Sequence, residues 1–232
     1  MTVNMNAFES GAALAAGLAD KVADTLAAAV AARGSASFAV SGGSTPKAFF
    51  EALSSRDLDW GKVTITLVDE RFVPEDNPRS NHKLVKENLL KNKAAAANFL
   101  PLYQEAADAE KSAVIATEAT KGIDNPFDIA ILGMGGDGHT ASFFPGGNNL
   151  EKAIDPKTPR GIITMEAEGA GEPRLTFTFA SLQDARLLVL HIEGDGKKQV
   201  LAKAESDGPE TEMPIRAILR RAASPVEIYW AP

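Results

Sequence analysis

Residues 127–139 read FDIAILGMGGDGH, a short apolar run that passes directly into a loop containing four glycines. A run that is mostly Val, Ile, Leu, Phe and Ala is typical of a strand buried in a parallel sheet, and glycines allow the tight turns that follow such strands. Residues 37–40 pass into SGGSTP in the same way, and residues 63–68 pass into DERFVP. The sequence therefore predicts an α/β fold in which three unusual loops follow three strands.

Strand and helix patterns alternate along the rest of the chain. Strands are predicted at residues 37–40, 63–68, 127–132, 161–165, 175–179, 187–192 and 226–230. Helices are predicted at residues 7–32, 46–53, 81–90, 107–120, 197–204 and 214–221. This alternation is typical of a three-layer sandwich, in which helices cover both faces of a mostly parallel sheet. No linker-like segment divides the chain, so we predict one domain over residues 1–232.

Two details of this fold are also predicted. In the first helix, Leu14, Leu18 and Val22 recur every four residues and draw an apolar stripe, and Gly34 provides a stop. Residues 174–179 and 186–192 are separated by a short polar segment, which would suit an antiparallel pair.

The composition excludes several classes of function. The chain has 232 residues, with 24 Lys and Arg against 31 Asp and Glu, a net charge of −7. This balance argues against a general nucleic-acid or anionic-membrane binder, which needs clustered basic residues. The absence of cysteine excludes disulfides, thiolate zinc sites and a cysteine nucleophile. The first residues lack a signal-peptide pattern and no apolar run spans a membrane, so we expect a soluble cytoplasmic protein.

The first loop, Ser41 to Pro46, has the outline of a phosphate cradle. Adjacent glycines let backbone N–H groups approach a ligand, and the helix N-terminus that follows favours an anion. Thr45 would cap that helix and Pro46 would occupy its first position. The loop is not a Walker A motif, because Lys47 follows a proline. An ordinary glycine-rich turn explains the pattern equally well.

The second loop places three charged residues, Asp69, Glu70 and Arg71, at the end of a strand. Arg71 would hold a phosphate or carboxylate through two hydrogen bonds, with Asp69 or Glu70 orienting it. The alternative is a solvated loop. Downstream, Ser80 and Asn81 are predicted to cap the next helix.

The third loop matches the dinucleotide fingerprint at Gly133, Gly135 and Gly138, but its context excludes NAD. The fingerprint needs a long helix and then a strand ending in an acid, whereas Pro145 soon stops any helix here. What remains is His139, a side chain suited to proton transfer near neutral pH. One His and one Asp do not fill a zinc shell, so we predict no metal. His191 lies within an apolar run and is interpreted as a strand histidine.

These loops resemble the 6-phosphogluconolactonase family, and the resemblance extends over the whole chain. It is carried above all by GMGGDGHTASFFPG at residues 133–146, and also by the first two loops with Ser80-Asn81. Further matches are PRLT at residues 173–176 and GDGK at residues 194–197. The first loop and the GDGK segment are weaker matches when each is taken alone. The resemblance implies a Rossmann-like fold related to glucosamine-6-phosphate deaminase and ribose-5-phosphate isomerase.

The resemblance also implies an activity and a site. The activity is hydrolysis of 6-phospho-D-glucono-1,5-lactone to 6-phosphogluconate in the oxidative branch of the pentose phosphate pathway, without a cofactor. The general base corresponds to His139, with Asp137 beside it. Substrate contacts fall on Ser41, Gly42, Gly43, Ser44, Thr45, Asp69, Arg71, Gly135, Gly136, Gly138, Arg174 and Lys197.

Two other functions stay open at the level of the sequence. Glucosamine-6-phosphate deaminases share the Asp-Gly-His triplet but continue with a glutamate-bearing segment, where this chain has Phe143-Phe144-Pro145. A non-catalytic sugar-phosphate sensor would need no histidine base. We expect a phosphosugar lactone as the partner, with no nucleic acid and no membrane. The oligomeric state and the pose of the substrate are not determined by the sequence.

Overall fold

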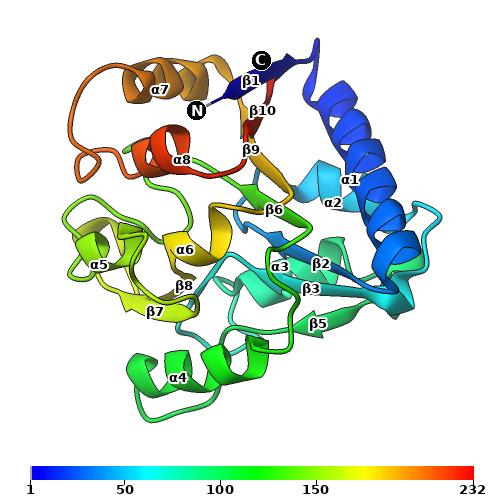
Figure 1. Ribbon diagram of the computed structural model, residues 1–232, viewed down its shortest axis with the longest axis horizontal. Coiled ribbons are helices and arrows are strands. Elements are labelled where there is room, and N and C mark those ends of the chain that lie inside the picture. The colour runs from blue at the N-terminus through cyan, green and yellow to red at the C-terminus, as the bar shows by residue number, and fades with distance from the viewer. Residues whose placement is uncertain (1) are drawn as a thin grey trace.

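A sheet of seven parallel strands forms the centre of the computed structural model, which describes residues 2–232 (Figure 1). The strand order is β1-β10-β9-β6-β2-β3-β5, and every neighbouring pair is parallel. The strands are β1 (Val3–Ala7), β2 (Ala36–Val40), β3 (Val63–Leu67), β5 (Asn98–Leu100), β6 (Ile129–Leu132), β9 (Leu187–Glu193) and β10 (Val226–Ala231). The predicted α/β fold with a mostly parallel sheet is therefore confirmed.

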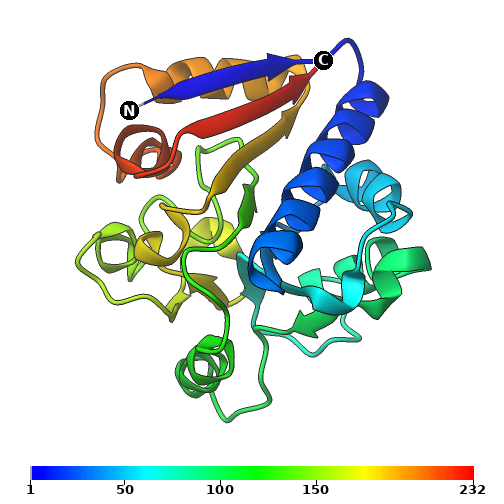
Figure 2. The same ribbon diagram turned by 45° about the vertical axis from the view of Figure 1, so that its right-hand side comes forward.

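Helices cover both faces of this sheet, as Figures 1 and 2 show. They are α1 (Gly11–Arg33), α2 (Lys47–Ser54), α3 (Asn81–Asn88), α4 (Ala109–Thr120), α5 (Leu150–Ile154), α6 (Phe179–Leu182), α7 (Asp195–Glu205) and α8 (Ile215–Arg221). Helices α1 and α2 pack against each other on one face, while α7 and α8 lie on the other. Three short 3₁₀ turns, η1 (Trp60–Lys62), η2 (Asn92–Ala96) and η3 (Glu168–Ala170), complete the regular structure.

A second, antiparallel sheet joins β4 (Asp69–Arg71), β8 (Arg174–Phe177) and β7 (Ile162–Met165) in that order. The chain enters it at Val68, whose N–H still bonds the main sheet at Val40 O while its carbonyl accepts from Phe177 N. The predicted antiparallel pairing of residues 174–179 with residues 186–192 is wrong, because residues 187–193 form β9 of the parallel sheet. The residues of β9 are apolar and buried nearly throughout, as an inner parallel strand requires.

The N-terminal prediction is wrong in part. The first helix begins at Gly11 rather than Ala7, because Ser10 caps it by accepting from Ala13 N at 3.2 Å. The residues before it form β1, an exposed edge strand without a buried apolar run. The stop at Gly34 is confirmed: its φ is 82°, in the left-handed region that favours glycine.

The start of α2 also differs from the prediction. The helix begins at Lys47 with Pro46 as its N-cap residue, and no side chain caps it, so Thr45 is not the cap. The strands β1, β4 and β5 and the short helices α5 and α6 were not predicted. Of the helices described, none combines the length and the apolar character needed to cross a membrane.

Candidate active site

The three predicted loops meet at the carboxyl ends of β2, β3 and β6, where they surround a cavity of about 310 Å³. Its wall includes eleven of the predicted site residues: Ser41, Gly42, Gly43, Ser44, Thr45, Asp69, Arg71, Gly135, His139, Arg174 and Lys197. Asp137, Gly136 and Gly138 belong to the same third loop without lining the cavity. Parallel strands bring their carboxyl ends to one edge, so segments distant in the sequence become neighbours.

His139 and Asp137 form a pair inside the third loop. The pKa of Asp137 is lowered to about 2, chiefly by its side-chain hydrogen bond to His139. The carboxylate is therefore the acceptor, and His139 Nδ1–H donates to Asp137 Oδ1 at 2.6 Å. The same oxygen accepts from His139 N at 3.1 Å. This arrangement holds the proton on Nδ1 and leaves the Nε2 lone pair able to take a proton.

The ring of His139 is held on two further sides. The ring of Phe144 lies 4.3 Å away between centroids, and Gly135 lies against the Nδ1 edge. A Cβ added at Gly135 would come within 2.2 Å of His139 Nδ1 and 2.6 Å of Asp137 Oδ1. Glycine is therefore required at this position for the histidine to keep its place.

Backbone hydrogen bonds close the third loop on itself. Gly135 N donates to His139 O at 2.8 Å, and Gly138 N donates to Gly135 O at 3.1 Å. The residues before α8 support it from outside, since Ile215 N donates to Gly138 O at 2.9 Å. Gly138 has a φ of 81° and packs on Met213, so a side chain there would be strained and crowded. These N–H groups are therefore used in hydrogen bonds that fix the shape of the third loop.

Two arginines face each other across the small sheet. In the antiparallel register of β4 and β8, Arg71 is directly opposite Arg174, so both side chains leave the same face of the sheet. Burial, and to a smaller extent the charge of Arg71, lowers the pKa of Arg174. Like charges directly opposite each other are unfavourable without an anion. The pair therefore provides a positive wall suited to an anionic ligand.

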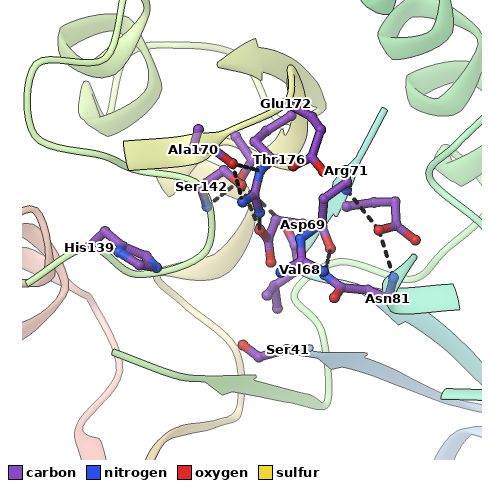
Figure 3. Close-up of polar contacts among 12 residues, drawn as sticks. Ser41, Val68, Asp69, Arg71, Asn81, His139, Ser142, Ala170, Glu172 and Thr176 are labelled. Carbon is purple, nitrogen blue, oxygen red and sulfur yellow. Dashed lines mark hydrogen bonds and ion pairs between the residues drawn. The ribbon is translucent and has the colours of Figure 1, made fainter. Parts of the chain in front are cut away.

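Asp69 connects the second and third loops. Its Oδ2 accepts from Ser142 Oγ at 2.5 Å and lies 3.7 Å from Arg174 Nη1 (Figure 3). Arg174 also donates through Nη2 to Ala170 O at 2.7 Å. Asp69 and Arg174 are both buried beside the cavity, and the single carboxylate of Asp69 offsets only part of the positive charge of the two arginines.

Glu70 points away from the cavity and organises the backbone behind it. Its carboxylate accepts from the backbone N–H groups of Arg71, Asn81 and His82 at 2.7–2.8 Å, and from Ser80 Oγ at 3.1 Å. Burial raises the pKa of Glu70 although these N–H donors act in the opposite direction. Glu70 therefore fixes Arg71 relative to the start of α3. The predicted cap is also confirmed, since Ser80 Oγ accepts from Lys83 N at 3.2 Å.

We predict that Glu70→Gln lowers the free energy of unfolding by about 1–3 kcal/mol, because an amide nitrogen would face buried donors in place of an acceptor. Urea denaturation would measure the loss. As a control, Glu118→Gln removes only an exposed ion pair with Lys121 and should cost less than about 0.5 kcal/mol. Equal effects of the two substitutions would contradict the role assigned to Glu70.

The first loop is tied to the third by Ser41. Its Oγ donates to Ile131 O at 2.9 Å and accepts from Gly133 N at 3.0 Å, so the hydroxyl holds two strand ends together. Gly42 lies against the Asn81 side chain, where an added Cβ would come within 1.9 Å of Asn81 Oδ1. The close approach explains why this position of the loop is a glycine.

Asn81, Phe144 and His191 line the cavity but were absent from the predicted site. The sequence predicts only a capping role for Asn81. Its position in the cavity wall depends on the path that the chain takes between β4 and α3. His191 is buried in β9 as predicted, with its Nε2 3.0 Å from Glu193 Oε1, yet it also reaches the cavity. A single histidine within an apolar run does not indicate, from the sequence alone, that its side chain reaches a cavity. Among residues 2–232, no cluster of three or more His, Asp or Glu side chains could hold a metal ion.

Comparisons with known proteins agree on one family. Residues 9–230 match the family model described as glucosamine-6-phosphate isomerases/6-phosphogluconolactonase. The chain is 69% identical to a 6-phosphogluconolactonase of Rhizobium meliloti (strain 1021) over 232 residues, covering 100% of both chains. A crystal structure of a 6-phosphogluconolactonase from Shewanella baltica superposes with a TM-score of 0.95 at 39% identity, covering 100% of this chain and 98% of that one. A monomeric glucosamine-6-phosphate deaminase shares the fold, with a TM-score of 0.78 at 18% identity, covering 99% and 97%.

Proposed function

The chain belongs to the family of glucosamine-6-phosphate isomerases and 6-phosphogluconolactonases, and we propose that His139 is the general base of its reaction. That reaction is hydrolysis of 6-phospho-D-glucono-1,5-lactone to 6-phosphogluconate, the activity of its relatives at up to 69% identity. The observation that carries the proposal is the His139–Asp137 pair, which keeps a proton on Nδ1 of a histidine that lines the cavity.

In the proposed mechanism, His139 Nε2 takes a proton from a water molecule as its oxygen attacks the lactone carbonyl carbon. The charge that develops on the carbonyl oxygen is stabilised by N–H donors of the cavity wall. When the tetrahedral intermediate collapses, the bond to the ring oxygen breaks and the imidazolium returns its proton to that oxygen. Asp137 stabilises the imidazolium between the two steps. A lactone carbonyl is reactive enough that no covalent nucleophile is required.

The phosphate is proposed to lie against Arg71, Arg174 and Lys197, with the glycines of the first loop supplying backbone donors. This assignment is supported by the two arginines that face each other across β4 and β8. Binding the phosphate remote from the reacting carbon orients the ring and contributes to transition-state binding. It also explains how a protein of net charge −7 accepts an anionic substrate, because the positive charge is local.

Two broader proposals accompany this assignment. Residues 1–232 act as one domain, since both sheets contribute residues to a single cavity. We also propose a cytoplasmic location, because a doubly charged sugar phosphate does not cross a membrane unaided.

The proposed function is tested by following acid release from freshly generated lactone, corrected for spontaneous hydrolysis. The purified protein should accelerate this reaction and should release no ammonia from glucosamine 6-phosphate. Ammonia release without lactone hydrolysis would assign the chain to the deaminase branch of the family. Binding of 6-phosphogluconate with no acceleration of either reaction would indicate a sensor.

We predict that Arg71→Ala weakens binding of 6-phosphogluconate by about 1.5–3 kcal/mol, the scale of charge-assisted hydrogen bonds, while binding of gluconate changes much less. Isothermal titration calorimetry with both ligands would measure the difference. Arg79→Ala is the matched control, since Arg79 is a nearby exposed arginine paired with Glu172 and does not line the cavity. Equal losses for both ligands would mean that Arg71 has only a structural role.

A further inference from the structure

Lys197 reaches the cavity from a different element than the two arginines. It lies in the first turn of α7, whereas Arg71 and Arg174 belong to the small sheet. Within residues 195–200 no side chain is buried, and the first buried residue of the helix is Leu201. Contacts other than apolar packing must therefore fix the first turn of α7 and the position of Lys197.

Gly194, the N-cap residue of α7, is bound through both of its backbone polar groups to the end of β10. Its N–H donates to Ala231 O at 2.8 Å, and its carbonyl oxygen accepts from Trp230 Nε1 at 3.2 Å. Its φ is 89°, in the region that favours glycine, so the chain can turn from β9 into the helix at this point. Figure 2 shows that the start of α7 lies close to the end of β10.

The indole of Trp230 makes a second contact with the same turn. Lys198 Nζ lies 3.7 Å from the centroid of the indole ring, a distance at which a cation is attracted to the ring face. Successive residues of an α-helix are rotated by about 100°, so the contact that directs Lys198 toward Trp230 also sets the direction in which Lys197 leaves the helix. Lys197 is the neighbour that lines the cavity.

Trp230 is itself held firmly enough to serve as an anchor. Its backbone lies in the parallel sheet between Ala7 of β1 and Ile192 of β9, and its carbonyl oxygen accepts from Phe8 N at 2.9 Å. Its side chain is half-buried and packs against the hydrophobic core. The position of the indole is therefore fixed by the sheet and does not depend on α7.

We propose that Trp230 is a positioning residue for phosphate binding, which acts by holding Lys197 at the cavity. The inference rests on the proposed function, because it requires the phosphate to lie against Lys197. Trp230 does not line the cavity, so it acts through the first turn of α7 and not by touching the substrate. Its replacement should therefore affect recognition of the phosphate and leave recognition of the sugar acid unchanged.

The test is a double-mutant cycle between Trp230→Phe and Lys197→Ala, in which calorimetry measures binding of 6-phosphogluconate and of gluconate. Trp230→Phe keeps an aromatic ring and loses the N–H, so it should weaken binding of 6-phosphogluconate by about 3- to 10-fold and of gluconate by less than about 2-fold. Lys197→Ala should weaken binding of 6-phosphogluconate by about 10-fold or more. Once Lys197 is replaced, Trp230→Phe should change that affinity by less than about 2-fold, because its effect passes through Lys197.

The matched control is Trp60→Phe, which removes the same kind of hydrogen bond at a distance from the cavity. Trp60 Nε1 donates to Arg56 O at 3.1 Å, and Trp60 does not line the cavity. This variant should leave the affinities for both ligands within about 2-fold of wild type.

A second variant keeps the test decisive if Trp230→Phe does not fold, as judged by its urea denaturation curve. Lys198→Met then takes its place in the cycle, because Lys198 is exposed and its replacement removes only the cation that lies on the indole. A general effect of the lost charge would persist in the Lys197→Ala background, whereas the proposed effect should vanish there.

Equal weakening of 6-phosphogluconate and gluconate by Trp230→Phe would overturn the inference and make Trp230 a structural residue. The same weakening with and without Lys197 would overturn it as well. Failure of the proposed function is a separate result that shows without any Trp230 variant: wild type would hydrolyse no lactone, or Lys197→Ala alone would leave binding of 6-phosphogluconate unchanged.

Discussion

Replacing His139 by Asn is expected to lower kcat by about 10²–10⁴-fold, the usual contribution of a positioned proton transfer. Asparagine has a similar reach and keeps a polar group, so the fold and the binding of 6-phosphogluconate should persist. Steady-state rates with fresh lactone would measure the loss, and calorimetry would confirm binding. His82→Ala, outside the cavity wall, should stay within a few-fold of wild type. A folded His139→Asn variant with near-normal turnover would leave Asp137 as the remaining candidate base.

The pH dependence provides an independent test of the same role. A general base must be unprotonated to accept the proton of water, so kcat/KM should fall as the pH is lowered. Its bond to His139 lowers the pKa of Asp137 to about 2, so Asp137 remains ionised well below the acid limb. If His139 is the base, this fall in rate should disappear from the residual activity of His139→Asn. A variant that retains the same limb would assign it to another group.

Gly135→Ala is expected to lower kcat by about 10²-fold or more, although it adds one methyl group and removes no functional group. The new Cβ would come within 2.2 Å of His139 Nδ1, so the ring would have to move by about an ångström. Misplacement on that scale costs about 10²-fold in rate. The same steady-state assay would measure the effect, and a shifted His139 ring resonance in the NMR spectrum would show the displacement.

The neighbouring substitution Gly136→Ala separates this effect from a general disturbance of the loop. A Cβ at Gly136 would meet nothing within 4 Å, so the His139–Asp137 pair should remain in place. Its loss should be at least about tenfold smaller than that of Gly135→Ala. Similar losses from both substitutions would mean that loop flexibility, rather than the position of His139, limits the reaction.

The sequence pattern predicted the inner strands, because a strand that is buried on both faces consists mostly of apolar residues. The strands β2, β6 and β9 are apolar runs, and each was predicted within two residues of its observed ends. The edge strand β1 has no such apolar run, because its residues are mostly exposed and two of the five are asparagines. Its partner β10 is at the other end of the chain, with Val3 opposite Val226.

By itself, the sequence determined the features that depend on neighbours along the chain. The glycine-rich loops after β2 and β6 and the capping of α3 by Ser80 are of this kind, as is the proximity of Asp137 to His139. These contacts form between residues a few positions apart, so spacing and residue type are enough to predict them. Family resemblance extended the prediction to residues whose own spacing carries no such information.

Only the tertiary structure decided which distant residues meet. Arg71 faces Arg174 because the chain leaves the parallel sheet at Val68 and β4 pairs with β8 in one particular register. A shift of one residue in that register would turn one arginine to the opposite face. The amide of Asn81 is likewise oriented by Asp69 O and Gly42, which approach it only after the strands have paired. Strand register and burial are set by packing over the whole molecule, and no local pattern contains them.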